Sequence, residues 1–331
     1  MLWPAPGLDA GFERGVWAER AGYDDVWLPD GQGLQDPIAL AAALGVVTRT
    51  LRLCTGVVPI FNRPPAILAT GIIAAEQRAP ARFVLGLGTS TPNMIDRWYG
   101  LPFERPRTRM RETLFLLRSI LSGEKTGFTG ATVRSHGFRL QELPTARVPI
   151  HVAAMDAPML ELAGELADGV VLNDLTPPDR ISWALEQIDR GAKRAGRRVE
   201  DLEIAQRRAL RVAETAEKSR AALEFFRDQL AYYGSALAYQ RALVELGYRD
   251  AVEEIRAGYA GRDRTRTMRA VDDEMVARVY TFGSADACRA GLRAIYASGV
   301  ETIAVSPQDV DRLDWAASAE AFSAAAFSPG A

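Results

Sequence analysis

The 331-residue sequence is poor in the residues that metal centres and histidine-based catalysis need. It contains two histidines and two cysteines, and Cys54 and Cys288 lie far apart with no CxxC spacing. We therefore predict no metal site, and we expect both cysteines to be buried, reduced thiols. His151 falls in an apolar run and is expected to be structural, whereas His136 is expected at the surface.

The chain also lacks an excess of charge of either sign. Its formal net charge is −2, which gives no reason to expect a nucleic acid or a membrane surface as partner. No segment has the pattern of a secretion signal, and no run is apolar enough to cross a bilayer. These absences predict a cytoplasmic protein. Only three of the 40 basic residues are lysines, a bias typical of GC-rich genomes.

Short apolar runs alternate with helical patterns along the chain. The runs are apolar at consecutive positions, which is typical of strands covered on both faces. Six of them lie at 26–28, 51–54, 83–85, 150–153, 170–172 and 302–305, and further strands are expected at 2–3 and 202–210. Between the runs, apolar residues recur at helical spacing, as at Met159, Leu162, Ala163 and Leu166.

This alternation predicts parallel strands joined by helical crossovers. Eight such units favour an α/β fold of the (β/α)8 TIM-barrel type. An open doubly wound sheet is the alternative, but no GxGxxG follows the first strand, where a dinucleotide-binding fold would have it. We expect a single domain over residues 1–331 with two insertions, a hairpin-like one at 91–147 after the fourth strand and a helical one at 213–281 after the seventh.

In such a barrel the chemistry belongs to the loops that follow the strands. Asp30 follows the second strand, and Gly88, Thr89 and Ser90 end the fourth. Glycine allows the backbone to approach a ligand closely, and the hydroxyls and N–H groups of the next two residues suit a phosphate. Read alone, this segment is better explained as an ordinary turn at a strand end; the other loops favour the phosphate site.

Taken together, these loops resemble the luciferase-like flavin oxidoreductases. The similarity is strongest to the coenzyme F420-dependent branch related to methylenetetrahydromethanopterin reductase. The segments that carry the resemblance are 22–30, 55–65, 82–89, 159–169 and 171–173. The resemblance implies a barrel enzyme, a homodimer, and a hydride transferred between F420 and a small organic substrate.

The resemblance also implies which residues bind the cofactor. They are Thr55, Gly56, Val57, Gly88, Thr89, Ser90, Ala154, Met155 and Asp156. Within this set, a non-proline cis peptide is expected between Gly56 and Val57, backing the ring. On the substrate side we expect Asn173, together with Arg262 and Arg264. These arginines would grip an anionic substrate or cofactor tail, unless they belong to an ordinary solvated loop.

Two positions depart from the family pattern. Relatives that oxidise alcohols have a histidine after the acid that corresponds to Asp30, and this chain has Gly31. Asp30 is then a candidate acid–base group, an anchor for the ring or a structural carboxylate. Relatives usually have glycine where Asp156 stands. Asp156 is expected either to cap the following helix or to alter cofactor recognition.

The sequence therefore predicts an F420-dependent oxidoreductase. Two alternatives remain open. One is an FMN-dependent two-component monooxygenase, which would need a flavin reductase as partner. The other is a non-catalytic paralogue that binds the cofactor. The substrate and the direction of the reaction are not encoded in any motif.

Overall fold

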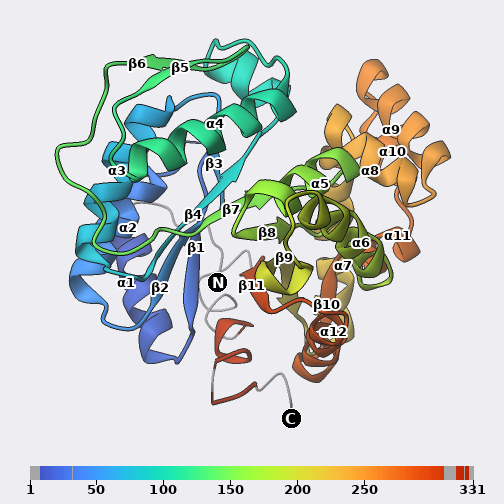
Figure 1. Cartoon of the computed structure of the whole chain (residues 1–331). Helices are drawn as coiled ribbons and strands as arrows, with labels where there is room; N and C mark the ends of the chain where they lie inside the picture. The colour runs from blue at the N-terminus through green and yellow to red at the C-terminus, as the bar shows by residue number, and fades with distance from the viewer. Residues whose placement is uncertain (1–7, 32, 309–317, 324, 328–331) are drawn as a thin grey trace. The chain divides into compact units, whose positions relative to one another are not determined.

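The computed structural model describes residues 8–31, 33–308, 318–323 and 325–327. The strand predicted at 2–3 lies outside these residues. The chain forms two compact units (Figure 1). Unit 1 comprises Met1–Val171 and Ala184–Ala205, and unit 2 comprises Leu172–Trp183 and Gln206–Ala331. Whether the chain is one domain, as the sequence suggested, stays a prediction, and each unit is described by itself.

Unit 1 is built on a parallel sheet. Its strands are β1 (Asp25–Leu28), β2 (Arg52–Thr55), β3 (Val58–Pro59), β4 (Phe83–Gly88), β7 (Ile150–Ala153) and β8 (Gly169–Leu172). They follow the order β1-β2-β4-β7-β8, and β3 pairs with β4. Every pairing is parallel, and β1, β4 and β8 are buried along their whole length. The predicted parallel, doubly covered strands are confirmed.

Helices cover this sheet between the strands. They are α1 (Leu8–Arg20), α2 (Pro37–Val47), α3 (Pro65–Arg78), α4 (Pro106–Leu121), α5 (Ala157–Leu166) and α6 (Pro178–Arg194), whose first turns belong to unit 2. A π-helix, η1 (Asn93–Trp98), follows β4, and a short 3-10 turn, η2 (Val199–Asp201), precedes the next strand. Proline in the first turn starts α2, α3, α4 and α5, where its missing N–H costs nothing.

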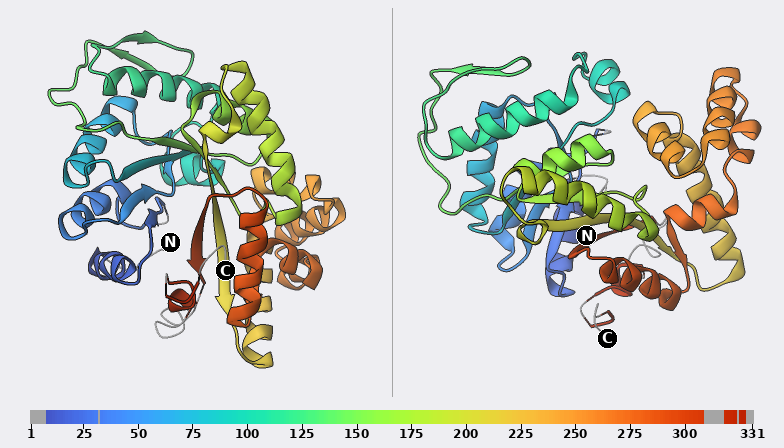
Figure 2. Two further views of the ribbon diagram at one scale, coloured as in Figure 1. Left: turned by 60° about the horizontal axis from the view of Figure 1, so that its bottom comes forward. Right: turned by 45° about the vertical axis from the view of Figure 1, so that its right-hand side comes forward.

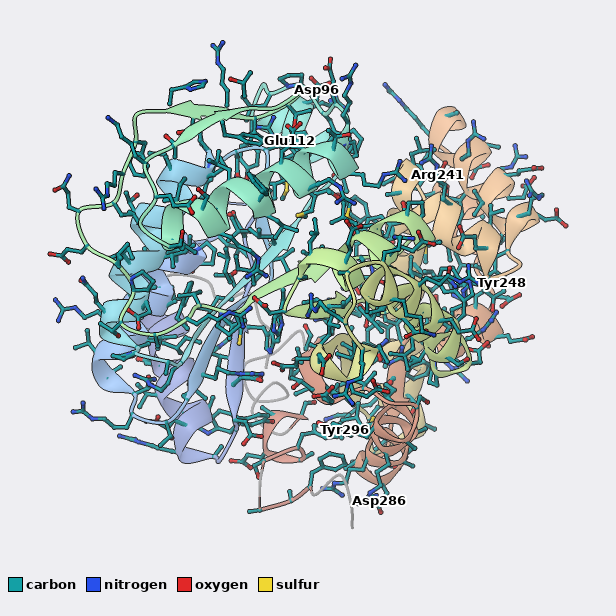
Figure 3. All side chains as sticks on the ribbon, in the orientation of Figure 1. Asp96, Glu112, Arg241, Tyr248, Asp286 and Tyr296 are labelled. Atoms are coloured by element: carbon teal, nitrogen blue, oxygen red, sulfur yellow. The ribbon has the colours of Figure 1, made fainter. Side chains whose placement is uncertain are left out.

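The insertion after β4 contains the predicted hairpin. Strands β5 (Gly127–Thr129) and β6 (Arg134–His136) pair antiparallel. Glu112 on α4 holds the turn between them (Figure 3). Its carboxylate accepts from the backbone N–H groups of Ala131, Thr132 and Val133 at 2.6, 2.8 and 3.0 Å. The hairpin is thus tied to the helix that precedes it.

Unit 2 contains most of β9 (Glu203–Val212), with β10 (Thr281–Gly283) and β11 (Thr302–Pro307) paired to it. Its helices are α7 (Ala216–Tyr233), α8 (Leu237–Glu245), α9 (Arg249–Gly261), α10 (Arg264–Arg269), α11 (Asp273–Val279) and α12 (Ala285–Ala297). The last of these packs against β10 and β11 (Figure 2). The predicted helical insertion is therefore present, whereas β10 was not foreseen.

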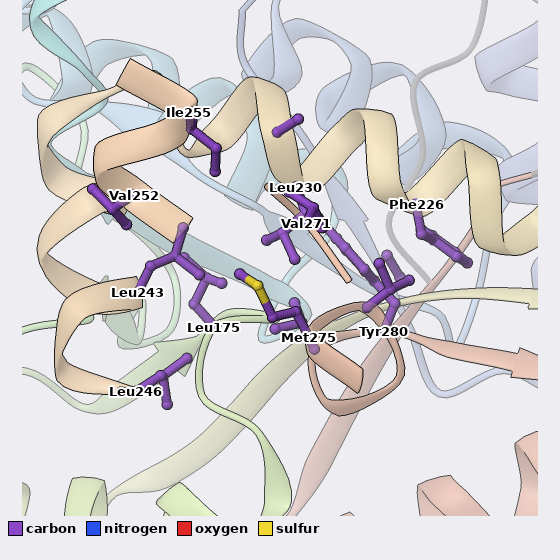
Figure 4. Packing of buried hydrophobic residues seen from close by; sticks show 14 residues of the cluster. Leu175, Phe226, Leu230, Leu243, Leu246, Val252, Ile255, Val271, Met275 and Tyr280 are labelled. Atoms are coloured by element: carbon purple, nitrogen blue, oxygen red, sulfur yellow. The ribbon is translucent and has the colours of Figure 1, made fainter. Parts of the chain in front are cut away.

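The helices of unit 2 enclose an apolar cluster of their own. Phe226 and Leu230 on α7, Leu243 on α8, Ile255 on α9 and Tyr280 before β10 meet there (Figure 4). Phe226 and Tyr280 stack with ring centroids 4.5 Å apart. Burial of this many large side chains gives the insertion a core that fixes its helices. No helix in the described part of the chain is long and apolar enough to cross a membrane.

Candidate cofactor and substrate site

The loops after β1, β2 and β4 meet in unit 1. The Gly56 N–H donates to the Leu28 carbonyl oxygen at 2.7 Å, which ties the end of β2 to the end of β1. The Thr55 hydroxyl donates to the Gly86 carbonyl oxygen at 2.9 Å and accepts from the Gly86 N–H at 2.8 Å. Thr55 is fully buried, and its hydroxyl holds β2 against β4; a contact of this residue with the cofactor stays a prediction.

The peptide between Gly56 and Val57 is cis, as predicted. Two glycines of β4 make room for this stretch of chain. A Cβ atom on Gly86 would lie 2.1 Å from the Thr55 carbonyl oxygen, and one on Gly88 would lie 2.5 Å from the Val57 side chain. Both contacts are closer than any side chain tolerates, so the close approach of β2 to β4 requires glycine at both positions.

The Gly88–Thr89–Ser90 segment leaves β4 in a tight turn. Ser90 has a φ of 60°, and its hydroxyl donates to the Met94 sulfur at 2.7 Å in η1. Among the described residues, the Thr89 hydroxyl makes one long contact of 3.4 Å, to the Ser90 carbonyl oxygen. Of the two predicted hydroxyls, that of Thr89 is therefore the one with donor capacity left for a ligand.

Asp156 caps helix α5. Its Oδ1 accepts from the Met159 N–H at 2.9 Å, and its backbone is extended, as an N-cap residue requires. The capping interpretation of this residue is thus confirmed. One of the N–H groups at the start of α5 is already bonded to Asp156, which lowers the capacity of this helix end for an anionic ligand. Ala154, two residues before the cap, is buried.

Asp30 is held by an arginine that the sequence did not single out. Its side chain is 9% exposed, and the Arg63 guanidinium bonds both to it and, at 2.6 Å, to Asp36. Burial raises the pKa of Asp30, and the Asp36 charge adds to this, while Arg63 opposes it. Burial also acts to raise the pKa of Asp36, but the Ala39 N–H and the Arg63 guanidinium outweigh it and lower that pKa.

A side chain at Gly31 would be strained by the backbone and would have to displace Met94. The φ of Gly31 is 131°, and a Cβ atom there would lie 2.2 Å from the terminal methyl group of Met94. A histidine at this position would need a strained backbone and a displaced methionine. Since Met94 also contacts Ser90, it joins the loop after β1 to the loop after β4.

The predicted substrate-side residues lie in unit 2. The Asn173 side chain accepts from the Leu175 N–H at 2.9 Å and so shapes the loop after β8. Arg262 has a left-handed backbone at the end of α9. With Tyr259, Thr267 and other neighbours it lines a hollow of about 250 Å³. Arg264 lines the same hollow and pairs with Asp228 at 2.7 Å. A contact of these residues with substrate or cofactor stays a prediction.

The buried histidine belongs to a charged cluster at the amino ends of the strands. Arg52 at the start of β2 bonds to Asp25 at 2.9 Å and to Glu203 at 2.5 Å, and the His151 Nε2 lies 3.5 Å from Glu203. Burial lowers the pKa of His151 despite the nearby Glu203. This end of a barrel serves stability rather than chemistry, which agrees with the structural role expected for His151. His136 contacts the Thr129 hydroxyl at 2.8 Å in the hairpin.

Within the described ranges, no group of three histidine, cysteine or carboxylate side chains is arranged to hold a metal ion. Both cysteines are buried and unpaired by disulfide. The loops after β1, β2 and β4 thus contribute hydroxyls, the buried carboxylate of Asp30 with its arginine, and backbone groups.

Comparison with known proteins places this geometry in a family. The chain is 32% identical to 5,10-methylenetetrahydromethanopterin reductase of Methanolobus tindarius over 207 residues, which cover 62% of this chain and 63% of that protein. The match thus spans less than two thirds of the relative's length.

Two solved structures share the fold. The coenzyme F420-dependent tetrahydromethanopterin reductase of Methanopyrus kandleri superposes with a TM-score of 0.81 at 20% identity, covering 96% of this chain and 95% of that one. An F420-dependent secondary alcohol dehydrogenase superposes with a TM-score of 0.78 at 17% identity, covering 98% and 97%. This likeness confirms the (β/α)8 class over the open sheet. The model of the luciferase-like monooxygenase family matches residues 4–302, and the chain therefore belongs to that family.

Proposed function

We propose that the protein is an oxidoreductase that binds coenzyme F420 and exchanges a hydride with a small organic substrate. The family and the named relatives support an enzyme that uses a flavin-type cofactor. The observation that carries the proposal is the contiguity of the three loops. The loops after β1, β2 and β4 are joined by the Gly56–Leu28 hydrogen bond and by Met94.

The phosphate-bearing part of such a cofactor fits the residues at the end of β4 better than those at the start of α5. The Thr89 hydroxyl has only a long contact of 3.4 Å, and it follows the glycine-rich end of β4. At α5 the carboxylate of Asp156 uses the Met159 N–H and adds a negative charge. We therefore expect Thr89 and the backbone of Ser90 to bind the phosphate, and α5 to contribute less. Ala154 and Met155 remain proposed cofactor contacts.

When bound, the deazaflavin supplies a carbon centre that carries a hydride, and the protein binds, orients and excludes water. In this chain Asp30 is the proposed acid–base or anchoring group. Its pKa is raised by burial, which brings a carboxyl closer to the range where it exchanges protons near neutral pH. Arg63 fixes its orientation. Since Gly31 has no side chain and a backbone conformation that other residues rarely adopt, oxidation of an alcohol through a histidine at that position is not expected.

Two alternatives follow from the family. An FMN-dependent monooxygenase would use the same loops with a flavin reductase as partner, and a non-catalytic paralogue would bind the cofactor without turnover. We prefer F420 because the two solved structures that share the fold carry that cofactor in their names. Homodimer formation and a cytoplasmic location remain expectations.

The test is a titration of purified protein with F420 and, in parallel, with FMN, monitored by quenching of cofactor fluorescence. We expect micromolar or tighter binding of F420, on the order of −8 kcal/mol, and weaker binding of FMN. Preferential FMN binding, together with NADH-driven oxygen consumption in the presence of a flavin reductase, would overturn the proposal. Binding of neither cofactor would overturn it as well.

A further inference from the structure

Two adjacent arginines of β9 lie beside one buried aspartate in unit 2, and one of them pairs with its carboxylate. The Arg207 guanidinium bonds to Oδ2 of Asp174, and the Ala209 N–H donates to Oδ1 of the same residue at 2.6 Å. Arg208 donates to the Thr281 hydroxyl at 2.8 Å and reaches the backbone carbonyl oxygen of Asp174 only at 3.5 Å. Both carboxylate oxygens of Asp174 are thus already engaged.

The cluster carries one more positive charge than negative. Among the described residues, Asp174 is the only carboxylate in an ion pair with either arginine. Arg208 and Asp174 are each 3% exposed. Burial lowers the pKa of Arg208, although Asp174 opposes this. A buried charge without a counter-charge destabilises the folded protein, so a bound anion that supplies the counter-charge would stabilise this cluster.

Tyrosines add donors around Arg207. Tyr280 is 2% exposed, and its hydroxyl is buried with no hydrogen-bond partner among the described residues. Its ring is fixed by the stack on Phe226 (Figure 4). Tyr233 and Tyr239 pack with ring centroids 4.8 Å apart, and these two and Tyr280 lie near enough to Arg207 to contribute to the rise of its pKa. Guanidinium and phenol donors together match the oxygens of a carboxylate or phosphate.

The two arginines differ in access. The side chain of Arg207 is 22% exposed, whereas Arg208 is buried and bonded to β10. Asp174 follows directly after β8, and loops in this position bind substrates in (β/α)8 enzymes. Arg208 therefore positions the cluster, and Arg207 is the member that a ligand can reach.

We propose that Arg207, with the hydroxyl of Tyr280, binds an anionic group of the substrate, a carboxylate or a phosphate. The inference rests on the proposed function, because it assigns the anion to the substrate of that reaction. It predicts that the substrate class is organic anions. The Asp174 carboxylate holds the guanidinium in place and leaves its other nitrogens for the ligand.

The test measures binding of inorganic phosphate to the full-length protein without cofactor, by thermal shift and calorimetry at constant ionic strength. We expect Arg207→Gln to weaken phosphate binding by about tenfold or more, since a charge-assisted contact is lost. Arg180→Gln is the matched control. Arg180 is also in unit 2, its side chain is 23% exposed, and it pairs with Glu245 at 2.8 Å. Phosphate affinity should be unchanged in this variant.

Because Arg207→Gln leaves Asp174 without its cation, the double variant Arg207→Gln/Asp174→Asn removes both charges together. It should fold, with an unchanged circular dichroism spectrum, and should also lose phosphate binding. Wild-type affinity in either Arg207 variant, or no phosphate binding by the wild type, would overturn the proposal.

Titration with F420 then distinguishes the source of the anion. If the anion belongs to the substrate, Arg207→Gln binds F420 as the wild type does. A parallel loss of F420 affinity would assign the anion to the cofactor and overturn the substrate assignment. Failure of the wild type to bind F420 would refute the proposed function, while the phosphate measurement, which contains no cofactor, would still report on Arg207.

Discussion

Replacement of Asp156 separates its capping role from any effect of its charge on the cofactor. The carboxylate accepts one hydrogen bond, from the Met159 N–H at 2.9 Å, and the residue is exposed. Loss of an N-cap of this kind costs about 1 kcal/mol when alanine replaces it, and only a few tenths when glycine does. Asparagine keeps the acceptor, so Asp156→Asn should leave stability almost unchanged.

These values predict the order of stability of the three variants. In urea or thermal unfolding, Asp156→Ala should be the least stable, with a fall in Tm of about 2 °C, then Asp156→Gly, then Asp156→Asn. The asparagine variant is the critical control, because it removes the charge without removing the cap. A loss of more than about 2 kcal/mol in Asp156→Asn, above the usual range of about 0.5–2 kcal/mol for loss of a whole cap, would refute the capping account.

The same variants report on the cofactor. If Asp156 only caps α5, all three should bind F420 within about twofold of the wild type, less than 0.5 kcal/mol. If the carboxylate also faces the phosphate, Asp156→Asn and Asp156→Gly should bind more tightly, since a like charge has been removed. A large loss of affinity in the glycine variant would contradict both descriptions of this residue.

Three further predictions concern other residues. Thr89→Val should weaken F420 binding about two- to tenfold through loss of a neutral donor, and an unchanged dissociation constant would remove Thr89 from the site. Gly31→Ala should lower the free energy of unfolding by about 1–3 kcal/mol because of the positive φ at this position. In urea unfolding, the added substitution Met94→Ala should recover the part of this loss that comes from the contact with Met94. Wild-type stability in the single variant would contradict this. Glu112→Gln should destabilise the protein by about 1 kcal/mol at neutral pH. Burial acts to raise the pKa of Glu112, but its bonds to Thr132 and the neighbouring N–H groups prevail and lower it from 4.5. The contribution of Glu112 to stability is therefore present above pH 4.5 and is lost as the pH falls through the pKa of the folded state. If wild type and variant differed in free energy of unfolding by the same amount at pH 3 and pH 7, this prediction would be wrong.

The sequence was informative where local pattern determines structure. Consecutive apolar residues at 83–85 and 170–172 predicted buried parallel strands, because a strand covered on both faces has no polar side. Asp156 was foreseen as a cap because it precedes a helical stripe that begins at Met159. The hairpin and the helical insertion followed from glycines and from apolar spacing in the same way.

The sequence did not show which side chains that are distant along the chain contact each other. Arg63 lies 33 residues from Asp30, and no periodic pattern links two side chains that meet through the ends of different strands. The same holds for Arg207 and Asp174, which are also 33 residues apart. β10 is only three residues long, too short for its pattern to stand out from the helices around it.

Side-chain direction was a second feature that the sequence did not show. Thr55 was predicted to contact the cofactor, which stays a prediction, and the structure adds that its hydroxyl is bonded to Gly86. The strand before it is buried nearly throughout, so its sequence does not show which face each residue occupies. Only the pairing of β2 with β4 decides that Thr55 points toward its neighbour.

The central claim is that the loops after β2 and β4 hold the cofactor, with a smaller contribution from the loop after β7. Hydrogen–deuterium exchange of the purified protein, with and without saturating F420 and with FMN as comparison, tests it most directly. We expect F420 to slow exchange at 55–59, 88–92 and 154–159 and to leave the hairpin at 127–136 unchanged. Unchanged exchange in these three segments with F420, or slowing there with FMN alone, would contradict the account.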